Sequence, residues 1–388
     1  MSSRPVASRS ARSLGRMLAA SPRLAYRSLR RRYCRQSALL DYHLFGRSGA
    51  SRSLEKITIE LTHRCNLRCR MCSNFNDPQV PTPRGVQYAP AEELTYVQLA
   101  KFVDEASALT SAFGLTGGEP TLSPHCMEII RHIKRKGLHC GLTTNGTQLQ
   151  RLAEEIVDSR LDWISLSLDG PKEVHDAIRG VPGTYRRLLD GVEALQVSKG
   201  KRKSPVPKIG VKFTLVGDNY RHVADVAAAA VRMNAVLLDI THLFFWTEEI
   251  VASQRAAYGD DVPCHVANTD GLLGMDPAGM HAALQELKKR SWPLHIRFLP
   301  DLDQTDTLAY YQQPARFVAA RRCLRPWLNC SLLPNGDVVP CLGYVAGNIK
   351  EQTFSQVWNS ARFRHFRRLL KKNRLFPACA RCCGLYEY

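Results

Sequence analysis

In the stretch Lys56-Ile-Thr-Ile-Glu-Leu-Thr62, apolar and polar residues alternate, and Cys65-Asn-Leu-Arg-Cys-Arg-Met-Cys72 follows two residues later. The alternation predicts a half-buried β-strand. The three cysteines are separated by three and then two residues, so one short loop can bring their sulfurs around one corner of an iron–sulfur cube. Such a loop leaves the fourth iron open to a small molecule, whereas four cysteines close a cluster. The same spacing also occurs as part of zinc sites.

The composition suits a globular protein with a large core. The chain has 388 residues and a hydrophobic content of 44%, which fit two or three structural units. It contains no apolar run of roughly 18 residues that would span a membrane, and no apolar segment of a secretory signal. Most of its thirteen cysteines cluster at 65–72 and 323–383. They are therefore predicted to be metal ligands in a reducing compartment, which places the protein in the cytoplasm.

Positive charge is concentrated at the N-terminus. The formal net charge is +19, and residues 1–40 contribute ten arginines and no acid, so the rest of the chain nets +9. Further basic runs lie at 199–203 and 362–374. Such charge favours contact with phosphates, anionic lipid or acidic substrates. Solvated faces and a solubilising tail would have the same composition.

The N-terminal arm divides into two parts. Residues 1–12 are rich in Ser and Arg and are predicted to be disordered. Residues 13–40 carry a rough apolar stripe that predicts a helix, interrupted at Pro22. A basic amphipathic helix can lie on an anionic membrane, pack on the rest of the protein or touch nucleic acid, and the composition also resembles a transit peptide. The arm is our candidate for peripheral membrane contact. No specific nucleic-acid partner is predicted, because no RNA-binding module is recognisable.

Between residues 55 and 250, short apolar runs alternate with helical patterns. Six β–α units in a row predict a parallel sheet with helices outside it. The runs at 163–168 and 209–216 have small or polar residues on one face, as expected for strands around a ligand-filled interior. The expected strands are 56–62, 111–116, 138–143, 162–168, 208–216 and 235–245, and the expected helices are 94–109, 125–136, 147–159, 184–198 and 219–233.

Four further motifs fall at the ends of expected strands, where parallel barrels place their chemistry. They are Thr116-Gly-Gly-Glu-Pro120, Thr143-Thr-Asn-Gly146, Ser165-Leu-Ser-Leu-Asp-Gly170 and residues 216–219. In the first, Gly117 and Gly118 would let the backbone approach a ligand closely, and Glu119 adds a negative charge. Hydroxyls in the third can bind ribose, and Arg179 can pair with a carboxylate. Gly-Gly-Glu-Pro and Asn-Gly are also ordinary turn sequences.

A second group of cysteines lies near the C-terminus. Pro334-Asn-Gly-Asp337 predicts a hairpin turn, which would bring Cys323 and Cys341 together, and Cys379 and Cys382 follow. Two pairs of thiols can close a Cys₄ site for a [4Fe–4S] cluster or for zinc.

Other cysteines have weaker assignments. Cys330 could replace Cys323 in the second group, and Cys383 is expected to point away from its neighbour. The lone cysteines are predicted to be small buried residues, with Cys264 or Cys330 as candidate hydrogen-atom donors. Residues 247–320, with a helix expected at 276–290 and a strand at 294–299, are expected to cover the open side of the barrel.

In these motifs the sequence resembles the radical S-adenosylmethionine (SAM) enzymes. The resemblance rests on CxxxCxxC at 65–72, Gly-Gly-Glu-Pro at 117–120 and Thr-Asn-Gly at 144–146. It implies an α/β fold with a partial, six-stranded TIM barrel. It also implies a [4Fe–4S] cluster whose open iron holds SAM and whose electron cleaves SAM to a 5′-deoxyadenosyl radical. The implied cluster ligands are Cys65, Cys69 and Cys72, and the implied SAM contacts are Met71, Gly117, Gly118, Glu119, Asn145, Ser167, Arg179 and Val216.

The C-terminal cysteines resemble the SPASM extension of that family. The order is a Cys–Gly–Cys hairpin, Gly-Asn-Ile at 347–349, Trp358 and a CxxC at 379–382. The resemblance implies one auxiliary [4Fe–4S] cluster, because the chain lacks the further cysteines of the full pattern; a structural zinc is the alternative. The implied ligands are Cys323, Cys341, Cys379 and Cys382.

We therefore expect four regions: a basic, partly helical arm (1–54), a partial barrel (55–250), a substrate-covering segment (251–320) and an auxiliary-cluster domain (321–388). The expected reaction is hydrogen abstraction from a substrate C–H bond, with a reductase of flavodoxin or ferredoxin type as electron donor. The expected substrate is a small molecule such as a sugar, nucleoside or lipid-linked intermediate. The alternatives are maturation of a ribosomal peptide and, from another class, a non-enzymatic iron–sulfur electron carrier or sensor.

Overall fold

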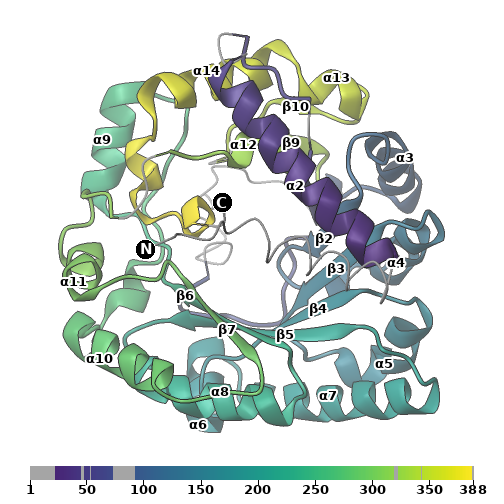
Figure 1. Cartoon of the computed structure of the whole chain (residues 1–388), viewed down its shortest axis with the longest axis vertical. Coiled ribbons are helices and arrows are strands. Elements are labelled where there is room, and N and C mark those ends of the chain that lie inside the picture. The colour runs from purple at the N-terminus through teal and green to yellow at the C-terminus, as the bar shows by residue number, and fades with distance from the viewer. Residues whose placement is uncertain are drawn as a thin grey trace, which may run out of the picture.

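A curved sheet of parallel strands forms the centre of the molecule (Figure 1). The computed structural model describes residues 22–44, 48–52, 54–72, 92–318, 322–341 and 343–386. Strands β1 to β7 lie side by side in sequence order and all run parallel, with Ile57 opposite Phe113 in the first pair. They are β1 (Lys56–Glu60), β2 (Ala112–Thr116), β3 (His139–Thr144), β4 (Trp163–Ser167), β5 (Lys208–Leu215), β6 (Leu237–His242) and β7 (His295–Leu299).

The predicted partial barrel is confirmed, and it gains a strand. All six strands expected between 55 and 250 are present, with ends within about three residues of those expected. The seventh, β7, comes from the segment expected to cover the barrel, and it pairs with β6 along the edge of the sheet. It satisfies backbone groups that an edge strand would leave unpaired.

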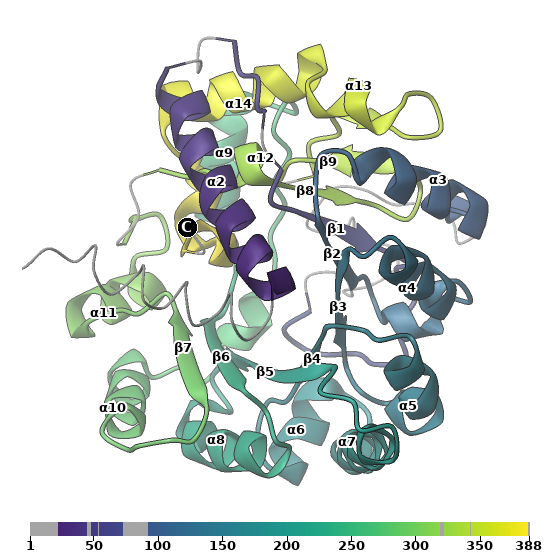
Figure 2. The ribbon, with the colours of Figure 1, turned by 45° about the vertical axis from the view of Figure 1, so that its right-hand side comes forward.

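Helices connect the parallel strands and cover the outside of the sheet (Figures 1 and 2). Buried apolar residues recur at helical spacing, as at Ile129, Ile130 and Ile133 of α4, which fixes the face that each helix turns to the sheet. The short helix α6 was not expected from the sequence. The helices are α3 (Tyr96–Ala106), α4 (Cys126–Arg135), α5 (Leu149–Asp158), α6 (Lys172–Arg179), α7 (Thr184–Lys201), α8 (Val223–Arg232), α9 (Glu248–Tyr258), α10 (Pro277–Lys288) and α11 (Gln304–Gln312), with 3₁₀ turns η2 (Pro120–Leu122), η3 (Tyr220–His222) and η4 (Thr269–Leu272).

The C-terminal region continues the same sheet. Strand β8 (Asn329–Leu332) pairs in parallel with β1, and β9 (Asp337–Val339) and β10 (Gly347–Asn348) extend the edge as antiparallel strands. Gly336 has φ +97° in the β8–β9 turn, as the predicted hairpin requires. Because β8 lies directly beside β1, the C-terminal cysteines have a fixed position relative to the loop that follows β1. The region also contains α12 (Arg325–Leu328), α13 (Phe354–Trp358), α14 (Ala361–Asn373), η5 (Pro377–Arg381) and η6 (Cys383–Tyr386).

One helix of the N-terminal arm lies within the described residues. It is α2 (Pro22–His43), which begins at the proline where the sequence predicted an interruption; the rest of the arm's expected helix, residues 13–21, lies outside the described residues. Tyr42 of α2 packs edge-on against Trp327 of α12, with ring centroids 5.1 Å apart. Across the described residues, no helix combines the length and the apolar character that a bilayer-spanning helix needs.

Candidate active site

The cysteine loop, Cys65–Cys72, follows β1 at the C-terminal edge of the sheet. Its backbone is tied to the end of α6. The amide of Arg68 donates to the carbonyl of Arg179, and the amide of Arg70 donates to the carbonyl of Ile178, both at 3.1 Å. The three cysteine side chains remain partly exposed. The loop is therefore held through its backbone, which leaves the thiols available to a ligand.

Two side chains direct donors at these sulfurs, one from the turn after β3 and one from the end of α6. Nδ2 of Asn145, which follows β3, lies 4.0 Å from Sγ of Cys65, and Nη1 of Arg179 lies 3.6 Å from Sγ of Cys69. Burial raises the pKa of the Cys69 thiol to about 11, and the Arg179 guanidinium opposes that rise. Donors of this kind stabilise anionic sulfur and tune iron–sulfur sites.

Gly117 and Gly118 pack against the backbone that leads into the cysteine loop. Gly117 has φ +142°, and a Cβ there would lie 2.2 Å from the carbonyl oxygen of Thr62; a Cβ on Gly118 would lie 2.4 Å from that of Arg64. The amide of Gly118 donates to Thr62 at 2.8 Å. The sequence suggested that these glycines allow close approach of a ligand. In the structure the close approach is to the residues before the cysteine loop, so the glycines set the position of that loop.

Glu119 follows these glycines, donates its amide to the carbonyl of Arg64 at 2.8 Å and is 1% exposed. Its Oε1 accepts from Oγ1 of Thr121 at 2.6 Å and from Oγ1 of Thr144 at 2.7 Å, and its Oε2 accepts from the amide of Asn145 at 2.7 Å. Burial raises the pKa of its carboxyl group, although these bonds favour the charged form. The side chain joins the ends of β2 and β3, and so places Asn145 beside Cys65.

Arg179 forms a buried ion pair at the end of β4. Its Nη2 lies 2.5 Å from Oδ2 of Asp169, a residue with no exposed surface. Burial disfavours the charged guanidinium, but Asp169 and the Cys69 sulfur more than offset this and raise the pKa of Arg179. The sequence resemblance implied a pair between Arg179 and a SAM carboxylate. In the structure, the guanidinium bridges Asp169 and Cys69. Ser167, the last residue of β4, is partly exposed at the same edge.

Met71 and Val216 belong to one apolar cluster, although they are far apart in sequence. Val216 follows β5 and is 3% exposed. Asn219 fixes this turn, because its Oδ1 accepts from the amide of Val216 at 2.9 Å and its Nδ2 donates to the carbonyl of Thr214 at 2.8 Å. The turn after β5 and the cysteine loop thus share an apolar wall.

The cysteines of the second group, Cys323, Cys341, Cys379 and Cys382, all line one small cavity. Cys379 is 7% exposed, and burial, followed by the neighbouring Cys341 and Cys323, raises the pKa of its thiol. Four thiols around one cavity match the ligand number of a closed [4Fe–4S] cluster. The rest of the described lining is mainly apolar and includes Pro326, Phe366, Leu370, Phe376 and Leu385.

The remaining cysteines lie elsewhere. Cys330 lies in β8 opposite Ile57, outside the described lining of that cavity, and burial raises the pKa of its thiol to about 12. Cys264 is 6% exposed, and the side chain of Cys383 is outside the described part of the structure. Among the residues that the structure describes, no group of three or more His, Cys, Asp or Glu is spaced for a single metal ion. The buried lone cysteines are Cys34, Cys126, Cys140 and Cys264.

Arg381, between the last two cysteines of the second group, was not singled out from the sequence. It has no exposed surface. Its guanidinium donates to the carbonyls of Ala309 at 3.0 Å, Tyr310 at 2.5 Å and Gln313 at 2.7 Å, all at the C-terminal end of α11. A cation at this end satisfies carbonyls that the helix leaves unpaired. Arg381 therefore fastens the CxxC turn to α11.

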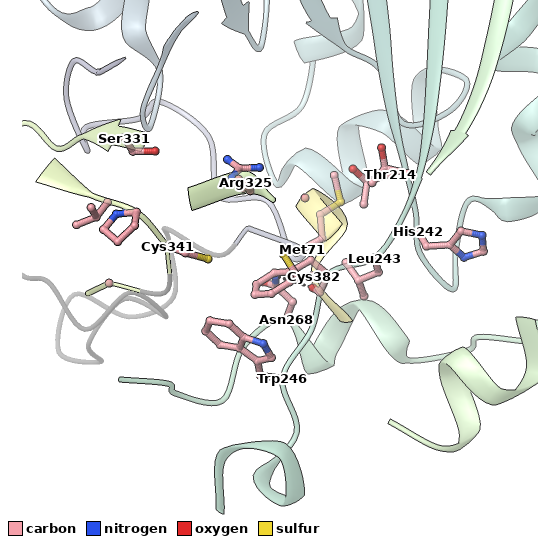
Figure 3. A pocket seen from close by; sticks show the side chains of 16 residues that line it. Met71, Thr214, His242, Leu243, Trp246, Asn268, Arg325, Ser331, Cys341 and Cys382 are labelled. Atoms are coloured by element: carbon pink, nitrogen blue, oxygen red, sulfur yellow. Dashed lines mark hydrogen bonds between the residues drawn. The ribbon is translucent and has the colours of Figure 1, made fainter. Parts of the chain in front are cut away.

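A cavity of about 300 Å³ lies between the two cysteine groups (Figure 3). Met71 of the cysteine loop lines one part of it, and Cys341 and Cys382 line another. Trp246 contributes an aromatic wall and Arg325 a guanidinium. This volume is at the lower end of the range for pockets that enclose small organic ligands.

His242, at the end of β6, also lines this cavity. Its Nδ1 lies 2.8 Å from the hydroxyl of Tyr311 on α11. Burial lowers the pKa of His242 to about 3, so its imidazole is neutral at physiological pH. Tyr311 of α11 therefore supports the cavity wall through its contact with His242.

Comparison with known proteins identifies the family. The sequence model of the radical SAM superfamily matches residues 59–227, which include the cysteine loop and the strand ends around it. The model of the SPASM iron–sulfur cluster-binding domain matches residues 323–383, which contain the second cysteine group. The chain is a radical SAM enzyme with a SPASM-like C-terminal domain. Its cofactors are accordingly SAM, the [4Fe–4S] cluster that binds SAM, and auxiliary iron–sulfur chemistry in the C-terminal domain.

Relatives of this radical SAM enzyme include proteins that act on cofactors. It is 29% identical over 332 residues to an AdoMet-dependent heme synthase of Methanosarcina barkeri, covering 84% of this chain and 87% of the relative. It is 26% identical over 361 residues to the tungsten-containing aldehyde ferredoxin oxidoreductase cofactor-modifying protein of Pyrococcus furiosus, covering 85% and 87%.

Among solved structures, SuiB of Streptococcus suis bound to S-adenosylmethionine shares the fold. The TM-score is 0.60 at 13% identity, over 83% of this chain and 69% of SuiB. The structure of anSMEcpe with bound AdoMet aligns with a TM-score of 0.54 at 19% identity, over 80% and 82%. At these identities the likeness concerns the fold alone.

Proposed function

We propose that this enzyme abstracts a hydrogen atom from a C–H bond of a small molecule held between its two cysteine groups. The observation that carries the proposal is the lining of the 300 Å³ cavity, which includes Met71 as well as Cys341 and Cys382. When bound, the [4Fe–4S] cluster and SAM supply the 5′-deoxyadenosyl radical. The protein binds and orients the reactants and excludes water from them.

In the proposed site, Cys65, Cys69 and Cys72 are the ligands of the SAM-binding cluster. The fit is supported by the donors that face their sulfurs, since Asn145 and Arg179 can stabilise thiolates at two of the three positions. The Asp169 carboxylate keeps the Arg179 guanidinium in place. Glu119 is a positioning residue in this proposal, because its carboxylate holds the Asn145 backbone.

The proposed SAM contacts are Met71, Asn145, Ser167, Arg179 and Val216, and Gly117, Gly118 and Glu119 are proposed to support the SAM site without touching SAM. Met71 and Val216 supply an apolar surface suited to the adenine ring, and the partly exposed Ser167 supplies a hydroxyl at the open edge. The two glycines and Glu119 act through the loop that they position, since their nearest partners are protein atoms.

We assign the auxiliary [4Fe–4S] cluster to Cys323, Cys341, Cys379 and Cys382. The shared cavity and its apolar lining support this assignment, because a dry surround limits solvent access to a cluster and tunes its potential. A cluster at this position would lie beside the proposed substrate cavity, which shares Cys341, Cys382 and Arg325 with it. It could then accept an electron from the substrate radical that hydrogen abstraction leaves, which would give net oxidation of the substrate.

We further propose that the substrate carries a carboxylate, and that a tetrapyrrole, one edge of which would enter this cavity, is the first candidate. Arg325 in the cavity lining can bind a carboxylate, and Trp246 can pack against a flat ring system. The similarity to a heme synthase over most of both chains supports this choice over a sugar or a nucleoside. Maturation of a peptide has weaker support, because the likeness to SuiB concerns the fold alone.

The proposed partners follow from the same chemistry. A reductase of flavodoxin or ferredoxin type would supply the electron, and the enzyme would work in the cytoplasm. The basic N-terminal arm would add a peripheral membrane contact, as its arginine content suggests.

The proposal is tested with the anaerobically reconstituted enzyme, dithionite and SAM, by measuring 5′-deoxyadenosine. We expect a carboxylated porphyrin to raise its formation roughly tenfold or more, since a bound substrate orients the reaction. The methyl ester of the same porphyrin is the matched control and should change the formation of 5′-deoxyadenosine little. The free acid should likewise have little effect on the Arg325→Gln variant. Equal stimulation by acid and ester, or stimulation by neither, would overturn the proposed substrate class.

A further inference from the structure

Helix α2 has two faces of different character. Cys34, Ala38 and Tyr42 are buried against the rest of the protein. Leu29, Tyr33, Leu40 and Leu44, which recur at intervals of four and seven residues, form the exposed apolar stripe of the helix; their exposed fractions are 44%, 66%, 49% and 68%. Helical spacing places such residues on one side. Large apolar side chains exposed together in this way mark an interaction surface more often than scattered ones do.

The packing of the inner face fixes the direction of this stripe. Asp41 is 1% exposed, and its carboxylate accepts from the backbone amide of Arg52 at 2.8 Å and pairs with its guanidinium at 2.9 Å. Sγ of Cys34 lies 3.8 Å from the carbonyl of Leu54. Rotation of α2 to bury the stripe would break these buried contacts, so the stripe stays turned away from the barrel.

Helix α14 lies beside the C-terminal half of α2 (Figures 1 and 2). Nζ of Lys371 lies 5.4 Å from the ring centroid of Tyr42, and Nη1 of Arg368 donates to the carbonyl of Ser48, just after α2, at 3.2 Å. Arg322 lies 3.2 Å from the imidazole of His43. Cations from other parts of the chain therefore lie around the C-terminal end of α2, where the exposed stripe also ends.

Basic residues outnumber acidic ones on these two helices. Helix α2 contains six arginines and one acid, the buried Asp41, and α14 contains six Lys or Arg and no acid. The nearby Glu55 is 12% exposed and is engaged by Arg31 and Arg35. An exposed apolar stripe close to many basic residues is typical of a helix that lies in the interface of an anionic bilayer.

We infer that α2 and α14 together form a docking surface for an anionic lipid bilayer. The leucines and Tyr33 enter the boundary between headgroups and acyl chains, and exposed basic side chains of α14 such as Arg368 and Lys372 contact lipid phosphates. The inference extends the membrane contact proposed for the arm by assigning half of it to the C-terminal domain. It does not depend on the radical reaction or on the substrate. An acidic protein or RNA would complement the charge but would leave the leucine stripe unexplained.

The experiment is co-sedimentation of the full-length protein with vesicles of phosphatidylcholine alone and of phosphatidylcholine mixed with phosphatidylglycerol. We expect binding to the mixed vesicles that weakens as salt rises. The variant Lys371→Glu/Lys372→Glu should bind roughly tenfold or more weakly, since each basic residue at an anionic surface contributes about fivefold. Leu40→Ser/Leu44→Ser should also weaken binding, and should leave the salt dependence in place.

A matched control separates a local surface from net charge. Lys201→Glu/Lys203→Glu makes the same charge change at the exposed end of α7, which Figure 1 shows far from α14. This variant should bind as the parent does. Equal loss of vesicle binding in both charge variants would overturn the proposed docking surface. Binding of the parent to phosphatidylcholine vesicles only, or to neither type of vesicle, would also overturn it. If deletion of residues 1–40 abolishes vesicle binding while Lys371→Glu/Lys372→Glu leaves it unchanged, that result would support a membrane contact of the arm and overturn the role of α14. Formation of 5′-deoxyadenosine by each variant reports that it is folded.

Discussion

The two cysteine groups of this enzyme are built in different ways. The loop at 65–72 holds three thiols within eight residues, keeps them partly exposed and surrounds them with polar contacts from Asn145 and Arg179. The second group gathers thiols from 323 to 382 around a largely apolar cavity. A site that must admit SAM needs an open, polar edge. A site with four protein ligands needs no such access, so it can be enclosed.

Removal of the first group should have the largest effect. We expect Cys65→Ala/Cys69→Ala/Cys72→Ala to lose about four irons and all formation of 5′-deoxyadenosine, because no protein sulfur then remains to hold the SAM-binding cluster. Iron and sulfide analysis with an assay for 5′-deoxyadenosine measures both. Cys126→Ser, which changes a buried thiol outside both groups, is the control. Full iron content in the triple variant would show that other residues bind that cluster.

Removal of the second group should separate the two sites. We expect Cys379→Ala/Cys382→Ala to lose about four irons and to retain uncoupled SAM cleavage, because the loop after β1 and its contacts are unchanged. The Cys330→Ser variant should keep the full iron content of the enzyme, because Cys330 lies in β8 and outside the described lining of the second group's cavity. Elemental analysis for iron and zinc identifies the metal that each variant loses. Loss of zinc in place of iron would contradict the auxiliary cluster.

Loss of the buried ion pair between Arg179 and Asp169, which lies beside the first group, should lower the stability of the protein. Arg179→Met leaves the carboxylate of Asp169 buried without its partner, so we expect the free energy of unfolding to fall by about 3–5 kcal/mol. The double variant Arg179→Met/Asp169→Asn should recover part of this loss, because the buried charge is removed. Denaturant unfolding measures both. No recovery in the double variant would mean that the contact of Arg179 with Cys69, and not the ion pair, carries the effect.

The smallest expected effect concerns His242 in the cavity wall. Its folded-state pKa, about 3, is below the ordinary value of 6.5. Between these two pH values the unfolded chain binds a proton at His242 and the folded chain does not. Stability should therefore fall as pH decreases from about 6.5 towards about 3, and His242→Gln should remove part of that slope. Unfolding midpoints across this range measure it. His222→Gln, on the surface, is the control; equal slopes for the parent and His242→Gln would contradict the assignment.

Local patterns explain which parts of the fold were predictable. The alternation in β1 and the apolar spacing in α4 depend on neighbouring residues, so their positions could be read within a few residues. Helix α6 was missed because its eight residues are too short to show a clear period. The seventh strand was expected as a strand, but its pairing with β6 depends on the closure of the sheet edge and not on its own sequence.

Residue patterns alone were enough to predict the cysteine loop, the six strands that follow one another between 55 and 250, and the family to which both cysteine patterns point. These features depend on residues close together in the chain. Only the packed structure shows that Glu119 holds Asn145, that Arg381 fastens the second cysteine turn to α11, and that α14 lies beside the end of α2. Such contacts join residues separated by tens or hundreds of positions. They are set by how the elements pack, which no local period records.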